Sequence, residues 1–181
     1  MLNKAILFFG LGIALLGLIT FLGTRAYVID QAPKRVMASI EARIAKGAGG
    51  WNACNHNRIY GPRPNSARRA NPDSVITSMA YDLSNGPVAV SGVIWPDYWS
   101  LSLYAQNSDN FFVVNDRQLS SPTFDFTIKL EEQSGAGTSS TELISPTTKG
   151  IMLIRRFVKK EADMPLVIEN QNAMACGPSS T

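Results

Sequence analysis

The chain has 181 residues, enough for one domain and a membrane anchor. Its formal net charge is +3, which is too small an excess to indicate nucleic-acid binding. A single histidine and two cysteines far apart in the chain do not fit the common zinc patterns, in which ligands come in closely spaced pairs. We therefore expect no metal or other cofactor.

The first element is an uncharged run at residues 5–23, AILFFGLGIALLGLITFLG. As a helix it would be about 28 Å long, close to the ~30 Å hydrocarbon core of a bilayer. A cleaved signal peptide is the alternative, but its apolar region is shorter, about 7–15 residues, and ends at a small-x-small site. The following residues, GTRAYVIDQA, offer no clean site of this kind. We expect residues 1–24 to form a tail and a retained transmembrane helix.

Positive charge does not fix the orientation of this helix, because Lys4 precedes it and Arg25, Lys34 and Arg35 follow it. A four-residue tail before the helix, a domain poor in lysine and two cysteines able to pair favour a cytoplasmic N-terminus. The sequence thus predicts a single-pass protein of a bacterial inner membrane, with residues 51–181 in the periplasm.

Small residues recur on one face of the predicted span, at Gly10, Ala14 and Gly17. Small side chains let two helix backbones approach closely in lipid, so this stripe is a candidate docking face for another transmembrane helix. The ordinary glycine content of membrane helices explains the same pattern.

Residues 25–50 form the predicted juxtamembrane segment. Within it, residues 33–46 read as a short amphipathic helix with Val36, Ile40 and Ile44 on one face and Met37 beside it. The GAGG run at 47–50 would end the helix. Such a helix could lie on anionic lipid headgroups or pack on the domain as a stalk.

Residues 51–73 are rich in Asn, Pro and Gly and show no periodicity, which predicts an extended loop. Four arginines in this loop are candidate contacts for a lipid headgroup or an acidic partner: Arg58, Arg63, Arg68 and Arg69. A solvated loop without a ligand is the plainer interpretation.

Beyond residue 74 the apolar residues recur with a period of two. Predicted strands cover 75–83, 88–95, 99–106, 111–118, 124–131 and 151–158, with turns such as SNGP at 84–87 between them. The alternation in WSLSLYAQ predicts that Leu101 and Leu103 are buried and that Ser100 and Ser102 lie on the opposite, less apolar face. Residues 161–176 could form a closing helix with Asp163 as N-cap. The sequence predicts a mainly β fold: an antiparallel sandwich or barrel-like domain, one N-terminal transmembrane helix and a short C-terminal helix.

The stretch YWSLSLYAQNSDNFFVVNDRQ at 98–118 resembles the signature of a family of predicted bacterial integral membrane proteins with a domain of unknown function of the 1254 type. AYDLSNGPVAVSG at 80–92 and SPTTKGIMLIRRFV at 145–158 resemble the same family. The resemblance implies a β-rich domain and a frequent neighbour, a sister family of small anchored proteins. It implies no catalytic residues.

No nucleophile elbow, P-loop, dinucleotide fingerprint or zinc-protease motif occurs in the sequence. Cys54 and His56 would point to opposite faces of an extended chain, so they make a poor nucleophile and base. The NSDN turn at 107–110 has oxygen ligands for calcium, but tight turns use the same residue types. Aromatic residues around one predicted hairpin belong to the core, line an apolar ligand pocket or form a partner interface: Trp95, Tyr98, Trp99 and Tyr104.

We therefore expect a membrane-anchored accessory or interaction subunit of a larger inner-membrane complex, without catalysis of its own. Its partners would be inner-membrane lipids and other transmembrane subunits. The alternative is a periplasmic domain that binds a lipid, a glycan or a small apolar molecule.

Cys54 and Cys176 are expected to form a disulfide that ties the loop before the first strand to the C-terminal segment.

Overall fold

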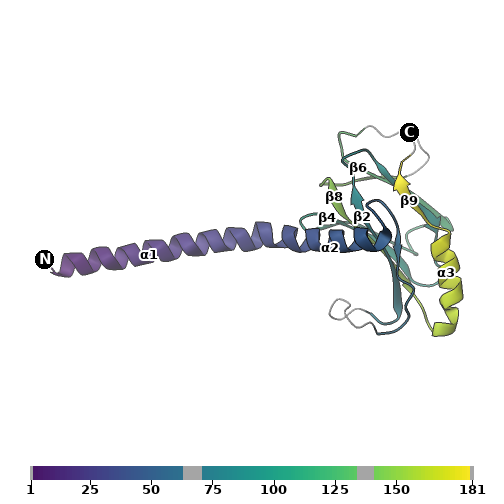
Figure 1. The fold of residues 1–181 in the computed structure, drawn as a ribbon, viewed down its shortest axis with the longest axis horizontal. Coiled ribbons are helices and arrows are strands. Elements are labelled where there is room, and N and C mark those ends of the chain that lie inside the picture. Colours follow the sequence, from purple (N-terminus) through teal and green to yellow (C-terminus); the bar gives the residue numbers. More distant parts are fainter. Residues whose placement is uncertain (1, 63–70, 134–140, 180–181) are drawn as a thin grey trace.

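The computed structural model describes residues 2–62, 71–133 and 141–179. The N-terminal helix is longer than expected: α1 (Leu2–Ala26) continues through a π-helical turn, η1 (Tyr27–Gln31), into α2 (Ala32–Ala48). It projects from the domain as one rod (Figure 1). Within these described ranges, one helix is long and apolar enough to cross a membrane, and none of its most apolar stretch is buried.

Helix α2 packs on the domain. Met37, Glu41, Ile44 and Ala45 are buried at the spacing of one helical face. Val36, expected on that face, is 57% exposed, so the buried stripe is rotated toward Met37. The predicted glycine stop is confirmed, since the helix ends at Ala48.

Nine strands form two separate sheets in the described part of the chain. The first sheet has the order β1-β2-β8-β4-β5 and is antiparallel throughout. The second has the order β7-β6-β3-β9. The strands are β1 (Asn55–His56), β2 (Ser74–Asp82), β3 (Val88–Val93), β4 (Trp99–Ala105), β5 (Asn110–Asn115), β6 (Thr123–Lys129), β7 (Thr141–Ile144), β8 (Lys149–Phe157) and β9 (Ala175–Pro178).

The main core lies between the two sheets and draws on alternate residues of the longer strands, as the period of two predicted. The second face of the first sheet is covered as well, because α2 packs on Ala80 and Ile151. Leu101 and Leu103 are buried as expected. Ser100 and Ser102 lie on the opposite face as expected, but that face is covered too, and each serine is only 4% exposed.

The C-terminal segment differs from the single closing helix expected. It forms a 3-10 turn, η2 (Glu161–Asp163), then α3 (Met164–Asn172), and finally β9. Asp163 holds the N-cap position, but its side chain makes no capping hydrogen bond. Residues 175–178 leave the helix because they pair with β3 at the edge of the second sheet.

The fold is a two-sheet, sandwich-like domain with a long apolar N-terminal helix and a short C-terminal helix. The barrel alternative was wrong because the strands divide between two sheets. The sandwich is not purely antiparallel either, since β7 pairs with β6 in parallel.

Candidate functional site

A buried arginine at one end of the sandwich is the most unusual feature of the domain. Arg156 lies on β8, paired with Val75 of β2 and Trp99 of β4, and is 0% exposed. Its side chain points to the core side of the sheet. There the guanidinium is covered by helix α3 and by the segment that follows α3. It donates from Nε to Asn170 Oδ1 (2.6 Å), from Nη1 to Thr77 Oγ1 (3.0 Å) and from Nη2 to Met174 Sδ (2.8 Å).

All three of these acceptors are neutral. No ion pair among the described residues includes Arg156, whereas buried charges are normally paired with an opposite charge. Burial lowers the pKa of the Arg156 guanidinium to about 10, which leaves the group charged at neutral pH. The site is therefore an interior positive charge held by neutral groups alone.

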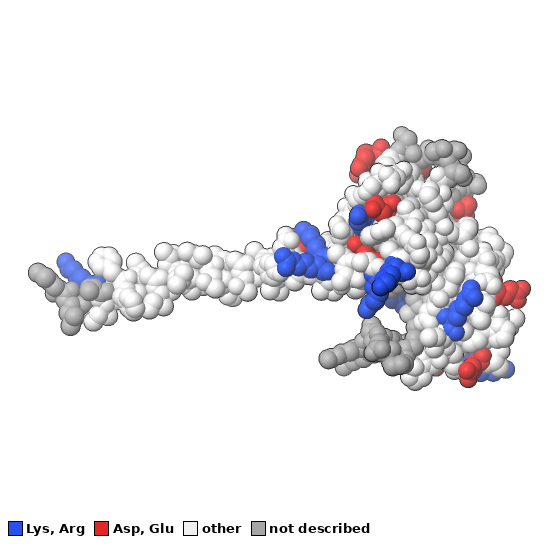
Figure 2. All heavy atoms as spheres, viewed as in Figure 1, with Lys and Arg blue, Asp and Glu red and all other residues white. Residues whose placement is uncertain are grey.

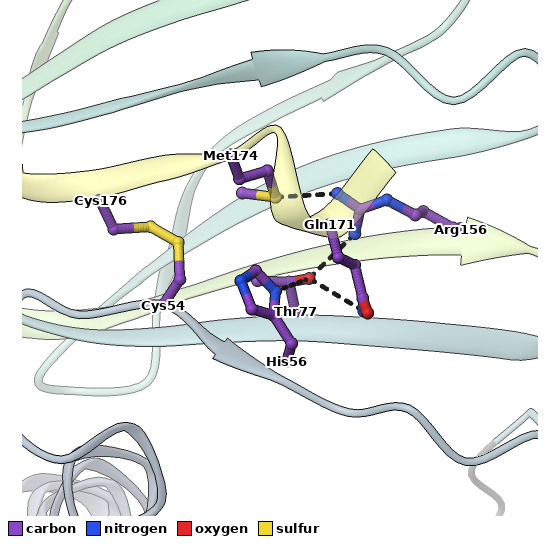
Figure 3. The surroundings of a disulfide bond; sticks show 7 residues. All are labelled: Cys54, His56, Thr77, Arg156, Gln171, Met174 and Cys176. Carbon is purple, nitrogen blue, oxygen red and sulfur yellow. Dashed lines mark hydrogen bonds between the residues drawn. A yellow bond between two sulfur atoms is a disulfide. The ribbon is translucent and has the colours of Figure 1, made fainter. Parts of the chain in front are cut away.

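Thr77 on β2 is the hub of the site (Figure 3). Its Oγ1 accepts from Arg156 and, at 3.4 Å, from Gln171 Nε2, and it lies 3.1 Å from His56 Nδ1. A hydroxyl accepts two hydrogen bonds and donates one, so the two lone pairs are taken by the two donors. The Thr77 proton is then left for His56 Nδ1, which must be the unprotonated nitrogen of a neutral ring.

The surroundings of His56 agree with a neutral imidazole. Burial, then the charges of Arg156 and Arg58, lower the pKa of His56 below its ordinary value. Protonation would place an N–H against a hydroxyl with no free lone pair, beside a second cation. The site therefore couples one titratable group to one buried charge.

The predicted disulfide between Cys54 and Cys176 is confirmed and borders this cluster (Figure 3). The two Cα atoms are 5.5 Å apart, within the usual range. Cys54 directly precedes β1, at an edge of the first sheet, and Cys176 lies on β9, at an edge of the second. The bond therefore joins the two sheets beside the Arg156 cluster.

Two buried polar atoms near the cluster have no hydrogen-bond partner in the described part of the chain: Gln171 Oε1 and Trp99 Nε1. A buried polar group without a hydrogen-bond partner lowers the stability of the fold, so each such atom marks a place where a bound ligand could supply the missing partner. Trp99 is the direct cross-strand neighbour of Arg156.

An apolar groove of about 300 Å³ opens on the far side of Asn170. Asn170 belongs to both features, because it lines the groove while its Oδ1 accepts from Arg156 and its Nδ2 donates to Val93 O. The groove lies between α3 and the segment after β3, and its lining is Val93, Ile94, Trp95, Pro96, Leu166, Glu169, Asn170 and Ala173.

The sequence-predicted candidates do not converge on this site. Gly10, Ala14 and Gly17 lie on the exposed rod of α1. Arg58 is exposed and donates to Asn172 Oδ1, whereas the positions predicted as its companions, Arg63, Arg68 and Arg69, lie outside the described residues.

The four aromatic candidates are separated by the fold. Trp95 and Trp99 are core residues, 7% and 0% exposed. Tyr104 lies on the other face of the first sheet, beside α2, and Tyr98 is 50% exposed. They form no common surface. Among the described residues no group of three or more His, Cys, Asp or Glu could hold a metal.

The sequence did contain a signal for the missed site. In IMLIRRFV, the alternation places Met152, Ile154, Arg156 and Val158 on one face. A charged residue in an otherwise apolar inward row requires a special environment.

The family model described as "Protein of unknown function (DUF1254)" matches residues 51–178. The chain belongs to this family. The DUF1254 match covers every strand and α3 but not the rod of α1 and α2, and it confirms the resemblance found at 98–118. No curated protein matches the sequence.

Two solved structures resemble this DUF1254 chain. The VPA0106 protein of Vibrio parahaemolyticus is 13% identical with a TM-score of 0.67, and the match covers 84% of this chain and 36% of that one. An uncharacterised protein of Burkholderia cenocepacia is 13% identical with a TM-score of 0.44, over 72% of this chain and 36% of that one. The chain thus spans about a third of each neighbour, and the first comparison supports the fold alone.

Proposed function

We propose that this protein is a single-pass, membrane-anchored interaction subunit of a larger inner-membrane complex, with its DUF1254 domain in the periplasm. The observation that carries the proposal is the unbroken helix from Leu2 to Ala48. Its N-terminal half has the length and composition of a membrane span, and its C-terminal half is packed into the domain.

The helix would hold the domain near the bilayer at a set orientation. Domain contacts begin at Pro33, whose carbonyl accepts from Ser108 Oγ. Only about ten residues separate this contact from the end of the apolar run, about 15 Å of helix. A flexible linker would let the domain move over a wide volume. A continuous helix instead keeps the domain close to the membrane surface, which suits a partner that lies beside the domain in the same membrane.

Charge at the junction supports the same arrangement. Figure 2 shows a mostly uncharged rod, with basic side chains gathered where it meets the domain. The exposed basic residues of α2 are Lys34, Arg35, Arg43 and Lys46. These side chains suit anionic headgroups at the membrane surface. The long apolar helix together with the disulfide indicates an extracytoplasmic domain.

The proposal is tested by native gels of membranes extracted in mild detergent, comparing two sets of leucine substitutions in α1. Gly10, Ala14 and Gly17 changed together should release the protein from a high-mass complex, because leucine blocks close helix approach. Gly12 and Gly23 lie on the opposite face, and changing them to leucine is the matched control. A Cβ atom at any of the four glycines in these two sets would have no neighbour within 4 Å outside the local helix backbone, so either set leaves the helix itself undisturbed.

Migration of the wild-type protein alone, with no partner cross-linked in intact membranes, would contradict the subunit role. Orientation is tested separately by alkaline phosphatase fused after Thr181, which should be active.

Ligand binding by the domain is the second candidate function. The observation that favours it is the groove between α3 and the segment after β3, whose volume of about 300 Å³ is at the lower end for small-molecule sites.

A further inference from the structure

Arg156 and the groove differ in chemistry but share one residue. The guanidinium is a buried cation whose acceptors Asn170, Thr77 and Met174 are all neutral. The groove is lined mainly by apolar side chains, including Trp95 and Leu166, the latter 58% exposed. Asn170 is half-buried and stands between the two.

A carboxylate is the acceptor that this arrangement lacks. Guanidinium and carboxylate pair through two parallel hydrogen bonds, which are shorter and stronger than bonds between neutral groups. Trp99 Nε1, a buried donor with no partner in the described part of the chain, is on the neighbouring strand and could serve the same anion. Glu169 at the groove rim is exposed, so salt screens its repulsion.

We propose that the Arg156 cluster and the groove form one binding site for a small carboxylate with an apolar tail, of the alkanoate class. The carboxylate takes the place of Asn170 Oδ1 at Arg156, and the tail lies in the groove against Trp95 and Leu166. This inference rests on ligand binding as the second candidate function and does not depend on the role in a membrane complex.

His56 provides a direct reporter of the site. It is the only histidine of the chain, so the one imidazole resonance in the NMR spectrum of isotopically labelled protein belongs to it. Its ring is joined to Arg156 through Thr77. An anion bound to Arg156 offsets the positive charge that disfavours protonation of the ring, so binding should raise the pKa of His56 toward its ordinary value.

The experiment titrates full-length protein in phosphatidylcholine nanodiscs with hexanoate, and with hexanamide as the neutral probe of equal size. We expect a saturable shift of the His56 resonance with hexanoate, with a Kd on the order of 1 mM for a ligand this small. Hexanamide should give at least a tenfold weaker response. Equal responses would overturn the carboxylate assignment while leaving ligand binding in place, and no saturable response to either probe would overturn the site.

Two variants test the two halves of the site. Ala173→Phe fills the groove without touching Arg156 and should abolish the hexanoate response, whereas Ala162→Phe, exposed and outside the groove, should not. Met174→Glu places a carboxylate where Met174 Sδ accepts from Arg156. This variant should bind hexanoate at least tenfold more weakly than Met174→Gln, its neutral control of similar size. Unchanged hexanoate binding in Ala173→Phe or in Met174→Glu would overturn the proposal.

Discussion

Replacing Thr77 by valine tests the hydrogen-bond network around Arg156 most sharply. Valine keeps the volume of threonine but removes the hydroxyl, so Arg156 Nη1 and Gln171 Nε2 lose an acceptor and His56 Nδ1 loses a donor. Thr77 is 0% exposed, so we expect no water to take the place of the lost hydroxyl at Arg156. Each unsatisfied buried group costs about 1–3 kcal/mol, and because two of the three contacts are short we expect a loss of about 3–5 kcal/mol.

The matched control is Thr77→Ser, which keeps the hydroxyl and loses one buried methyl group, for a cost of about 1 kcal/mol. The measurement is urea unfolding of the domain in detergent micelles, followed by tryptophan fluorescence. If Thr77→Val is no more destabilising than Thr77→Ser, the hydroxyl is not the hub of the site and the assignment of the neutral His56 tautomer fails with it.

Three further outcomes are expected. Reducing the Cys54–Cys176 bond should lower the free energy of unfolding by about 4–5 kcal/mol in the loop-entropy model, and unreduced protein from native membranes should show no free thiol after unfolding. Leu103→Ala should cost about 2–5 kcal/mol and Ser102→Ala about 1 kcal/mol, so equal urea midpoints would mean that the strand register is wrong. The pKa of His56 is lower in the folded than in the unfolded chain, so the unfolded chain takes up a proton first as the pH falls below about 6.5, and the free energy of unfolding should decrease. Urea unfolding series between about pH 7 and pH 5 should show this decrease for the wild-type protein and not for His56→Gln.

Features that depend on local pattern were predictable. The apolar run at 5–23, the helix stop at Gly49 and the alternation in β4 each follow from the residues at hand. The Cys54–Cys176 pairing was predictable because the chain has only two cysteines. None of these requires knowledge of distant contacts.

Features that depend on tertiary contacts were not predictable. Hairpin spacing does not tell which sheet a strand joins, so the division between β2-β8-β4 and β6-β3 could not be read from it. Ser102 is buried on the face away from the main core, where Arg155 Nη1 donates to its Oγ, and a period of two does not predict whether that face is covered. Arg156 is visible in the sequence as an odd inward residue, but its neutral acceptors come from β2, from α3 and from the segment that follows α3.

The central claim is that α1 binds a second membrane protein through one face while α2 carries the domain. Photo-cross-linking in living cells tests this directly, with a photoreactive phenylalanine analogue placed at position 14 on the small-residue face or at position 12 on the opposite face. We expect an adduct with another membrane protein from position 14 and none from position 12. Equal adducts from both positions, or no protein adduct from either, would contradict it.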